Sequence, residues 1–361
     1  MTVNIAYYVS SHGYGHAARQ QAIINELAQS SLQIFVRTAT PEKFFTHATA
    51  IHHQRYDIGM IQADALHMDI EASLQWMADF LGDESRLIAQ EIAFIQSHKI
   101  DLIVSDMPAI ACDIATQAGI PSLVMTHFTW DWVYAHYMDA YPHYQYIVDH
   151  LQAQYAKATL ALQMQYPIPH SFDMFPRVEP IGLVHNPMTQ SRADIRAAFA
   201  IPDGMSMVLL SMGGHRWGTS NINTLQTIDD VIFLVMPDAW EQVKATPEHF
   251  RYVPMDYPDY HNLIAAADCL VGKAGGSTVA EVIGHRTPMI YTTQAREQWR
   301  EIDLLSETLT RYAASQYVPM VDFLAGAWVD YFPTFLNQTH YWQDVDTNGA
   351  QQAARHILSM I

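Results

Sequence analysis

The sequence has little cysteine and no long apolar run. Its only two cysteines among 361 residues, Cys112 and Cys269, are too few for a disulfide scaffold and lie in segments with a buried pattern. We therefore expect free thiols in a reducing, cytoplasmic compartment. No apolar run approaches the ~18 residues that a membrane span needs, and the first residues lack the basic stretch of a signal peptide. We expect no integral membrane contact.

Positive charge is also scarce. The chain has 19 Lys and Arg against 37 Asp and Glu, a formal net charge of −18. Binding to nucleic acid or to an anionic membrane needs a basic surface, so neither is expected as the main partner. Disorder is excluded because half of the residues are hydrophobic and 11% are aromatic. A phosphate-bearing ligand would have to rest mainly on backbone amides.

Short apolar runs alternate with helical patterns in two series, and such alternation is typical of parallel sheets with crossover helices. The first series predicts strands at 3–9, 32–37, 101–105 and 121–126, and helices at 17–29, 73–97 and 109–118. The second predicts strands at 207–211, 230–236, 269–272 and 288–292, and helices at 260–267, 277–284 and 296–308. Five prolines between residues 166 and 190 separate the two series.

We therefore predict an α/β chain of two Rossmann-like domains. Residues 1–170 would form an N-terminal domain and residues 190–335 a C-terminal domain, facing each other across a cleft. Residues 336–361 would form a C-terminal helical segment that can pack back on the N-terminal domain.

A glycine turn with a histidine on each side follows the first strand, where a doubly wound domain places its ligand loop. Gly13 and Gly15 permit a tight turn, and His12 and His16 flank them. His16 falls in the first turn of the helix, where the helix dipole disfavours an imidazolium, so a neutral ring could act as a general base. Simple packing at the helix start, or a metal held by the two histidines, are the alternatives.

Asp106 ends a buried strand at the same edge of the sheet. A carboxylate there can hold the His16 imidazole in one tautomer. It can equally be an ordinary N-cap ahead of Pro108. The order Gly13, Gly15, Ala18 also fits a degenerate dinucleotide fingerprint, with Arg37 where an acid is usual, so an NADP-dependent oxidoreductase is one alternative.

Two glycine loops in the second half can receive a diphosphate, since backbone N–H groups at a helix start form an anion site. The candidate donor-side residues follow strand ends and are Gly213, Gly214, Lys273, Gly275, Gly276, Ser277, Thr278, Glu281, Glu297 and Gln298. The aromatic segment 128–134, with Asp64 and His67, can line an acceptor site or can simply be core.

These motifs together resemble those of the GT-B glycosyltransferases. A closer resemblance, along most of the chain, is to the glycosyltransferase-like N-terminal half of plant arabinokinase. It rests on the runs AYYV at 6–9, HGYGHAAR at 12–19, QADAL at 62–66, VSD at 104–106, TWD at 129–131, YA at 134–135 and GK at 272–273. The sequence shows no kinase-type phosphate loop, so the resemblance implies transferase rather than kinase chemistry.

The resemblance implies a metal-independent glycosyltransferase with no tightly bound cofactor and a nucleoside-diphosphate sugar, most readily a UDP-sugar, as substrate. His16 would be the base and Asp106 its partner. Glu281 would hold the ribose, the 275–278 turn the diphosphate, and Glu297 and Gln298 the sugar hydroxyls. A small-molecule or carbohydrate acceptor would meet His12, Gly13, Gly15, Asp64, Trp130 and Asp131. A non-catalytic sugar-nucleotide binding module and a sugar-nucleotide epimerase are further alternatives.

Overall fold

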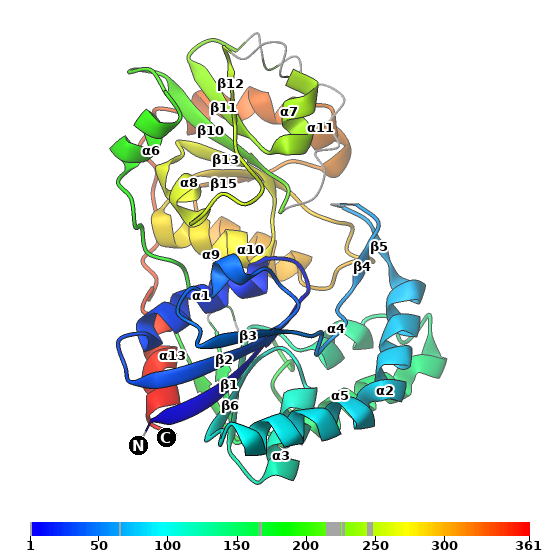
Figure 1. The fold of residues 1–361 in the computed structure, drawn as a ribbon. Coiled ribbons are helices and arrows are strands. Elements are labelled where there is room, and N and C mark those ends of the chain that lie inside the picture. Colours follow the sequence, from blue (N-terminus) through cyan, green and yellow to red (C-terminus); the bar gives the residue numbers. More distant parts are fainter. Residues whose placement is uncertain are drawn as a thin grey trace. The chain divides into compact units, whose positions relative to one another are not determined.

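The computed structural model describes residues 2–64, 66–164, 166, 168–213, 225, 228–243 and 248–361 (Figure 1). The chain divides into two compact units. Unit 1 comprises residues 1–61, 68–185 and 346–361, and unit 2 comprises residues 62–67 and 186–345. The C-terminal residues thus belong to unit 1, whereas a short segment from the first half of the chain belongs to unit 2.

Unit 1 is built on a seven-stranded parallel sheet with the order β3-β2-β1-β6-β7-β8-β9. Its strands are β1 (Val3–Val9), β2 (Leu32–Thr38), β3 (Ala50–His53), β6 (Leu102–Asp106), β7 (Ser122–Thr126), β8 (Leu160–Gln163) and β9 (Val178–Pro180). Its helices are α1 (Gly15–Leu27), α2 (Ile70–Ser97), α3 (Ile110–Ala118), α4 (Trp130–Ala135), α5 (Gln145–Tyr155) and α13 (Gly349–Leu358), with 3-10 turns at Glu42–Phe44 and Pro142–Tyr144.

Alternate residues of the central strand β1 face opposite layers, as the strand period requires. Ile5, Tyr7 and Val9 pack into one apolar cluster with the inner faces of α1 and α13. Ala6 and Tyr8 point the other way, into a second cluster with α2 and α3. A strand buried on both faces reads as a continuous apolar run, which is why the sequence pattern identified it.

Unit 2 is built on a six-stranded parallel sheet with the order β12-β11-β10-β13-β14-β15. Its strands are β10 (Ser206–Ser211), β11 (Val231–Val235), β12 (Phe250–Tyr252), β13 (Cys269–Lys273), β14 (Met289–Thr292) and β15 (Ser315–Tyr317). Its helices are α6 (Arg192–Ala198), α7 (Pro237–Val243), α8 (His261–Ala266), α9 (Gly276–His285), α10 (Ile302–Tyr312), α11 (Met320–Leu324) and α12 (Phe332–Phe335), with a 3-10 turn at Ala327–Tyr331. The predicted α/β class with two Rossmann-like units is confirmed.

Two local expectations need correction. The helix predicted at 296–308 begins only at Ile302, because residues 296–300 form turns and the Trp299 indole N–H donates to the Glu301 carboxylate at 3.0 Å. The segment 62–67, which runs from the end of β4 (Ile61–Gln62) to the residue before β5 (Met68–Asp69), lies within the predicted N-terminal domain but belongs to unit 2. Its Leu66 is buried in the apolar cluster of unit 2 rather than in that of unit 1.

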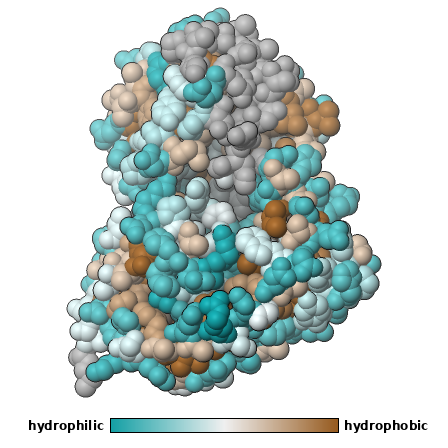
Figure 2. Space-filling view, turned by 45° about the vertical axis from the view of Figure 1, so that its right-hand side comes forward, coloured by the Kyte–Doolittle hydropathy of each residue, from teal (hydrophilic) through white to brown (hydrophobic). Residues whose placement is uncertain are grey.

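The described surface is mixed. On the face shown in Figure 2, hydrophobic residues form small separate patches among hydrophilic ones. Exposed large apolar side chains such as Trp76, Tyr146 and Val321 lie far apart in the sequence. Single exposed apolar side chains of this kind are usual on a surface that contacts water. Within the described residues, no helix combines the length and the apolar character that a membrane crossing requires.

Candidate functional site

His16 and Asp106 come together in unit 1, as the sequence predicted from their strand-end positions. His16 is the second residue of α1, and Asp106 is the last residue of β6. The His16 Nδ1 lies 3.1 Å from the Asp106 Oδ2, and both side chains are buried. A carboxylate at Nδ1 leaves Nε2 as the ring nitrogen that can accept a proton. The pair therefore has the geometry of an oriented general base.

The turn that follows Asp106 has a strained backbone, which buried contacts hold in place. Met107 has a φ of +81°, a conformation that costs free energy for a residue with a side chain. Its carbonyl accepts a hydrogen bond from the Tyr155 hydroxyl at 2.6 Å, and its side chain contacts Thr126. These buried contacts stabilise the strained turn and so hold the adjacent carboxylate in place. The N-cap alternative for Asp106 is not seen, since α3 begins at Ile110 with Ala109 as its cap.

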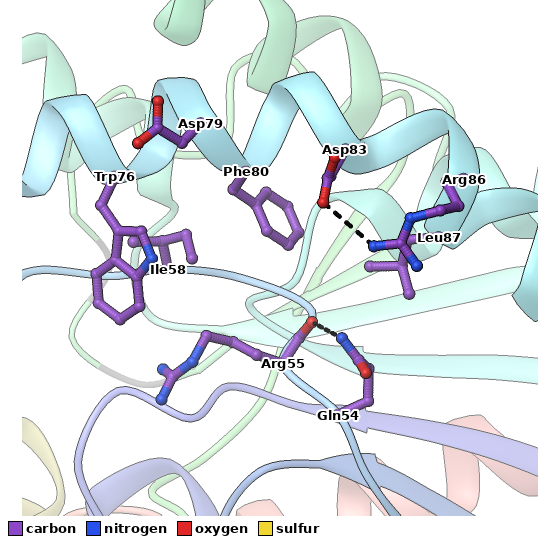
Figure 3. Close-up of a pocket in the computed structure, with 9 residues that line it drawn as sticks. All are labelled: Gln54, Arg55, Ile58, Trp76, Asp79, Phe80, Asp83, Arg86 and Leu87. Atoms are coloured by element: carbon purple, nitrogen blue, oxygen red, sulfur yellow. Dashed lines mark hydrogen bonds and ion pairs between the residues drawn. The ribbon is translucent and has the colours of Figure 1, made fainter.

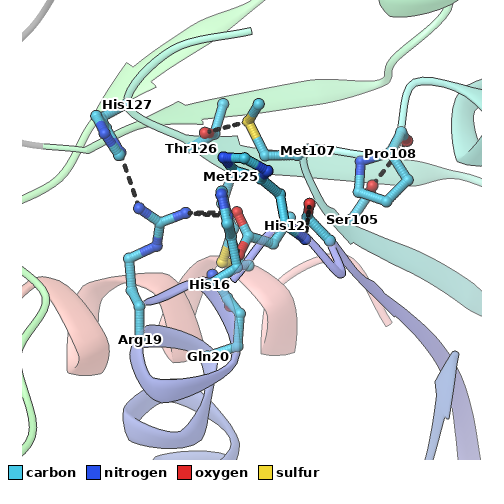
Figure 4. Close-up of polar contacts among 12 residues, drawn as sticks. His12, His16, Arg19, Gln20, Ser105, Met107, Pro108, Met125, Thr126 and His127 are labelled. Carbon is cyan, nitrogen blue, oxygen red and sulfur yellow. Dashed lines mark hydrogen bonds and ion pairs between the residues drawn. The ribbon is translucent and has the colours of Figure 1, made fainter. Parts of the chain in front are cut away.

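Two residues that the sequence analysis missed complete this cluster (Figure 4). Arg19, one turn after His16 on α1, donates from Nη2 to the Asp106 Oδ1 at 2.6 Å and also lies 3.0 Å from the His16 Nδ1. Its Nη1 lies 2.8 Å from the Nδ1 of His127, which follows β7. Burial acts to raise the pKa of Asp106, but Arg19 and His16 outweigh it and hold that pKa below its usual value. The i, i+3 spacing of His16 and Arg19 was the available signal.

His12, the other histidine of the glycine turn, is also held in one orientation. Its Nδ1 accepts a hydrogen bond from the Met60 backbone N–H at 3.3 Å, so the neutral ring carries its proton on Nε2. Its ring meets the Trp130 ring edge-on at a centroid distance of 5.2 Å. Gly13 is exposed and Gly15 is partly exposed. Gly13 has a φ of +68°, which a glycine adopts without strain.

Asp57 is a buried carboxylate that no sequence signal identified. Its Oδ2 accepts the Trp130 indole N–H at 2.8 Å, and its Oδ1 lies 3.4 Å from the Ser11 backbone N–H. Burial raises the pKa of Asp57, and hydrogen bonds from Ser10 and Trp130 act against that rise. Asp57 thus ties the loop after β3 to the glycine turn that holds His12.

Two predicted acceptor-side residues, Trp130 and Asp131, lie in the interior. Trp130 is 2% exposed, and one of its neighbours is the stacked ring of Tyr134. Asp131 is also buried, and burial raises its pKa. The core interpretation therefore fits both, and we expect Trp130 to act through Asp57 and His12, which it contacts, rather than by stacking on a sugar. Asp64, exposed in unit 2, accepts hydrogen bonds from the Leu66 and His67 backbone.

In unit 2, the predicted phosphate loop lies at the N-terminus of α9. Gly275 caps this helix, and Gly276, Ser277 and Thr278 form its partly exposed first turn. A Cβ at Gly275 would meet no atom within 4 Å, so the backbone there is open to a ligand. Gly213 follows β10 with a φ of +67°. Gly214 lies outside the described residues.

Lys273, the last residue of β13, brings one cation to the same strand edge of unit 2. A Cβ at Gly213 would lie 3.8 Å from its Cε. Burial lowers the pKa of Lys273 to about 8, although the carboxylates of Glu301 and Asp64 act to raise it. Lys273 can therefore change charge in the range near neutral pH.

Both carboxylate oxygens of Glu281 already have hydrogen-bond partners within the protein. Its Oε1 accepts hydrogen bonds from the Asn186 backbone N–H at 3.1 Å and from the Asn186 amide at 2.9 Å. Its Oε2 lies 3.1 Å from the His285 Nε2. Burial acts to raise the pKa of Glu281, but these partners lower it. Glu297 is exposed and Gln298 partly exposed, in the turns between β14 and α10.

Other features bear on the alternatives. Arg37, the residue that an NADP phosphate would need, is buried and ion-paired with Glu91, with its guanidinium 3.9 Å from the centre of the Phe94 ring. Its charge is already used inside the protein, which argues against that role. No three His, Cys, Asp or Glu side chains converge as metal ligands within the described ranges.

A surface hollow of about 280 Å³ lies elsewhere in unit 1, between α2 and the loop after β3 (Figure 3). Its lining mixes apolar and charged side chains, namely Gln54, Arg55, Ile58, Trp76, Asp79, Phe80, Asp83, Arg86 and Leu87. The Arg55 guanidinium lies 5.1 Å from the centre of the Trp76 ring. This hollow contains none of the residues that the sequence singled out.

The sequence of this chain is similar to part of a plant kinase. No family model matches the chain. The chain is 30% identical over 361 residues to L-arabinokinase of Arabidopsis thaliana, which confirms the predicted resemblance. The match covers 98% of this chain but only 34% of that protein, so the chain spans about a third of its relative's length.

Solved glycosyltransferase structures share the fold. A UDP-glucosyltransferase from Polygonum tinctorium that glucosylates indoxyl matches with a TM-score of 0.62 at 13% identity, covering 100% of this chain and 93% of that one. Arabidopsis thaliana UGT89C1, complexed with UDP, matches with a TM-score of 0.59 at 12% identity, covering 91% of this chain and 90% of that one. The chain therefore has the GT-B fold that these enzymes share.

Proposed function

We propose that this chain transfers a sugar from a nucleoside-diphosphate sugar to a hydroxyl acceptor. The observation that carries the proposal is the buried pair of His16 and Asp106, with 3.1 Å between Nδ1 and Oδ2. An imidazole oriented in this way accepts a proton at Nε2 from a hydroxyl, which then becomes a stronger nucleophile. The GT-B fold, shared with enzymes that use UDP, supports this assignment.

In the proposed reaction, the acceptor oxygen attacks the anomeric carbon of the donor as its proton passes to the His16 Nε2. The bond between the anomeric carbon and the phosphate oxygen breaks, and its electron pair leaves with the diphosphate. Backbone amides at the start of α9 and the Lys273 ammonium would stabilise the departing charge. Since the base is a side chain, the mechanism needs no metal for acceptor activation.

The donor assignment rests on unit 2. The open backbone at Gly275, the first turn of α9 and Lys273 would form the anion site expected for a diphosphate. Glu281 would contact the ribose, and Glu297 with Gln298 the sugar hydroxyls. UDP is the first nucleotide to test, with GDP and dTDP as the alternatives. His12, Gly13 and Gly15 would face the acceptor.

The test is transfer or donor hydrolysis measured as nucleoside-diphosphate release from UDP-, GDP- and dTDP-sugars, with and without a chelator. His16→Ala and Asp106→Asn should each slow turnover ~10²- to 10⁴-fold while leaving donor binding in place. A His16→Ala protein with the wild-type rate would remove the base assignment. Binding of sugar nucleotides with no turnover for any acceptor would instead favour the non-catalytic binding module.

A further inference from the structure

Asp106 is shared between two partners. Its Oδ2 lies 3.1 Å from the His16 Nδ1, and its Oδ1 accepts a hydrogen bond from the Arg19 Nη2 at 2.6 Å. The same Nη2 lies 3.0 Å from the His16 Nδ1, so Arg19 touches both members of the pair. All three side chains are buried, which strengthens the electrostatic interactions between them.

We propose that Arg19 is a positioning residue for His16. It holds both the Asp106 carboxylate and the His16 ring, so that the Nδ1–H of the ring points toward Asp106 and its Nε2 is available to accept a proton, and it places a second positive charge beside any imidazolium that forms. The inference rests on the proposed function only in one respect, namely that the proton comes from the hydroxyl of an acceptor. The arrangement of Arg19, Asp106 and His16 stands whatever the acceptor is.

The charge balance gives the physical reason. A histidine paired with a free carboxylate gains a full ion pair when it is protonated, which stabilises the cation. Here Asp106 already forms an ion pair with Arg19, so a protonated His16 would share one carboxylate with a second cation 3.0 Å away. Protonation of the ring is therefore less favourable than in a pair without the arginine.

Other polar and titratable groups face this cluster. The groups that face it from the neighbouring elements are His12 before α1, Tyr7 on β1, Asp57 after β3 and His127 after β7. The His127 Nδ1 accepts from Arg19, which requires a neutral ring with its proton on Nε2. Burial raises the pKa of Asp57 and of Tyr7.

The geometry allows a competing arrangement. Were Arg19 to donate to the His16 Nδ1, the neutral ring would carry its proton on Nε2 and could only donate to an acceptor. The nitrogen that carries the single ring proton therefore decides whether the His16 Nε2 can act as a base or only as a hydrogen-bond donor. The ¹⁵N chemical shifts of the ring nitrogens distinguish the two tautomers directly, without any substrate.

The experiment uses the full chain labelled with ¹⁵N-histidine, with the His16 signals assigned by their loss in His16→Gln. In the wild type we expect the neutral ring to carry its proton on Nδ1. In Arg19→Met the midpoint of His16 protonation should rise by about one pH unit, a tenfold gain in proton affinity. Arg19→Lys, which keeps the charge, should restore most of the wild-type midpoint. Arg177→Met removes an exposed arginine of unit 1 and is the matched control, with no expected shift.

Two results would overturn the inference. One is a neutral His16 with its proton on Nε2 in the wild type, a measurement that needs no variant to fold. The other is a folded Arg19→Met or Arg19→Gln protein whose His16 midpoint equals that of the wild type. If the shifts appear as expected but no sugar donor turns over, the role of Arg19 stands and the proposed reaction fails. Where turnover is found, the acidic limb of its pH profile should move with the same variants.

Discussion

The His12 ring occupies the space that a side chain on Gly59 would need. A Cβ on Gly59 would lie 2.7 Å from the His12 Nδ1, closer than real side-chain contacts allow. The next residue, Met60, donates its backbone N–H to that same nitrogen at 3.3 Å. The loop after β3 thus sets both the position and the tautomer of a histidine that lies 47 residues earlier in the chain.

Gly59→Ala should therefore displace His12 and slow sugar transfer, by about tenfold or more if the His12 Nε2–H contacts the acceptor. Gly59 also has a φ of +69°, so alanine adds ~1–2 kcal/mol of backbone strain. The measurement is the rate of nucleoside-diphosphate release together with the free energy of unfolding in urea.

Gly119→Ala is the matched control for Gly59→Ala. Gly119 has a nearly equal φ of +72°, but a Cβ there would meet nothing within 4 Å. The control should lose similar stability and keep its activity. Equal rates for the two variants would show that the position of His12 does not matter for turnover.

Glu281 offers a second separable prediction. Glu281→Gln keeps the oxygen that Asn186 contacts, but it removes the negative charge that would attract the ribose hydroxyls. We expect UDP to bind about tenfold more weakly, a cost of ~1.4 kcal/mol, while the affinity for inorganic pyrophosphate stays the same because pyrophosphate has no ribose. Isothermal titration of both ligands decides the question.

Asn186→Ala serves as the structural comparison for Glu281→Gln. It removes the amide donor at 2.9 Å and should lower the free energy of unfolding by ~1 kcal/mol with a smaller effect on UDP. If Glu281→Gln binds UDP like the wild type, the carboxylate has only the structural role that its three contacts already indicate.

The pair of His16 and Asp106 could be predicted because both residues follow strong local signals. Asp106 ends one buried strand of the parallel sheet, and His16 lies at the start of the helix that follows another, so both lie near the edge formed by the carboxyl ends of the strands. The strands themselves read as short apolar runs bounded by glycine or proline. The same reasoning located the α9 loop in unit 2, where β13 precedes it.

The residues that complete the site could not be predicted in this way. Asp57 and Gly59 lie in an irregular loop, where no period marks which side chain is buried. Trp130 was ambiguous, since an aromatic residue in a short helix suits a core and a binding face equally. Leu66 packs into the core of unit 2, most of which begins only at residue 186. The local sequence pattern does not encode such a long-range contact.

Lys273 gives a prediction about pH. Because burial lowers the pKa of Lys273 to about 8, the ammonium is charged below that pH and neutral above it. UDP affinity should therefore fall as the pH rises through 8, by the ~1.5–3 kcal/mol of a charged hydrogen bond, which is about tenfold or more. Titrations at intervals between pH 6.5 and 9.5 measure it.

Two variants separate Lys273 from other titrating groups. Lys273→Met should bind UDP weakly at every pH without the step near pH 8, and Lys273→Arg should bind it well throughout, since arginine stays charged. A step that persists in Lys273→Met belongs to another group and would rule out contact between Lys273 and the diphosphate.

A last prediction concerns stability rather than ligands. On α5, the His150 Nε2 lies 2.7 Å from the Oε2 of Glu84 on α2. The hydrogen bond from Glu84 raises the pKa of His150 above its ordinary value of 6.5, even though burial acts against it. A histidine with a raised folded-state pKa stabilises the protein fully below that ordinary value, and the contribution disappears as the pH rises through the folded-state pKa. The free energy of unfolding in urea, measured from pH 5.5 to 8.5, should therefore include a decrease that comes from this pair.

His150→Gln should remove that decrease, because glutamine keeps a hydrogen-bond donor toward Glu84 but does not titrate. His47→Gln, at an exposed turn of the same unit, is the matched control for the loss of a histidine. The difference in unfolding free energy between wild type and His150→Gln should be largest at pH 5.5 and smallest at pH 8.5. A difference that is constant across this range would mean that Glu84 holds His150 equally well in both protonation states, which the charge of the Glu84 carboxylate argues against.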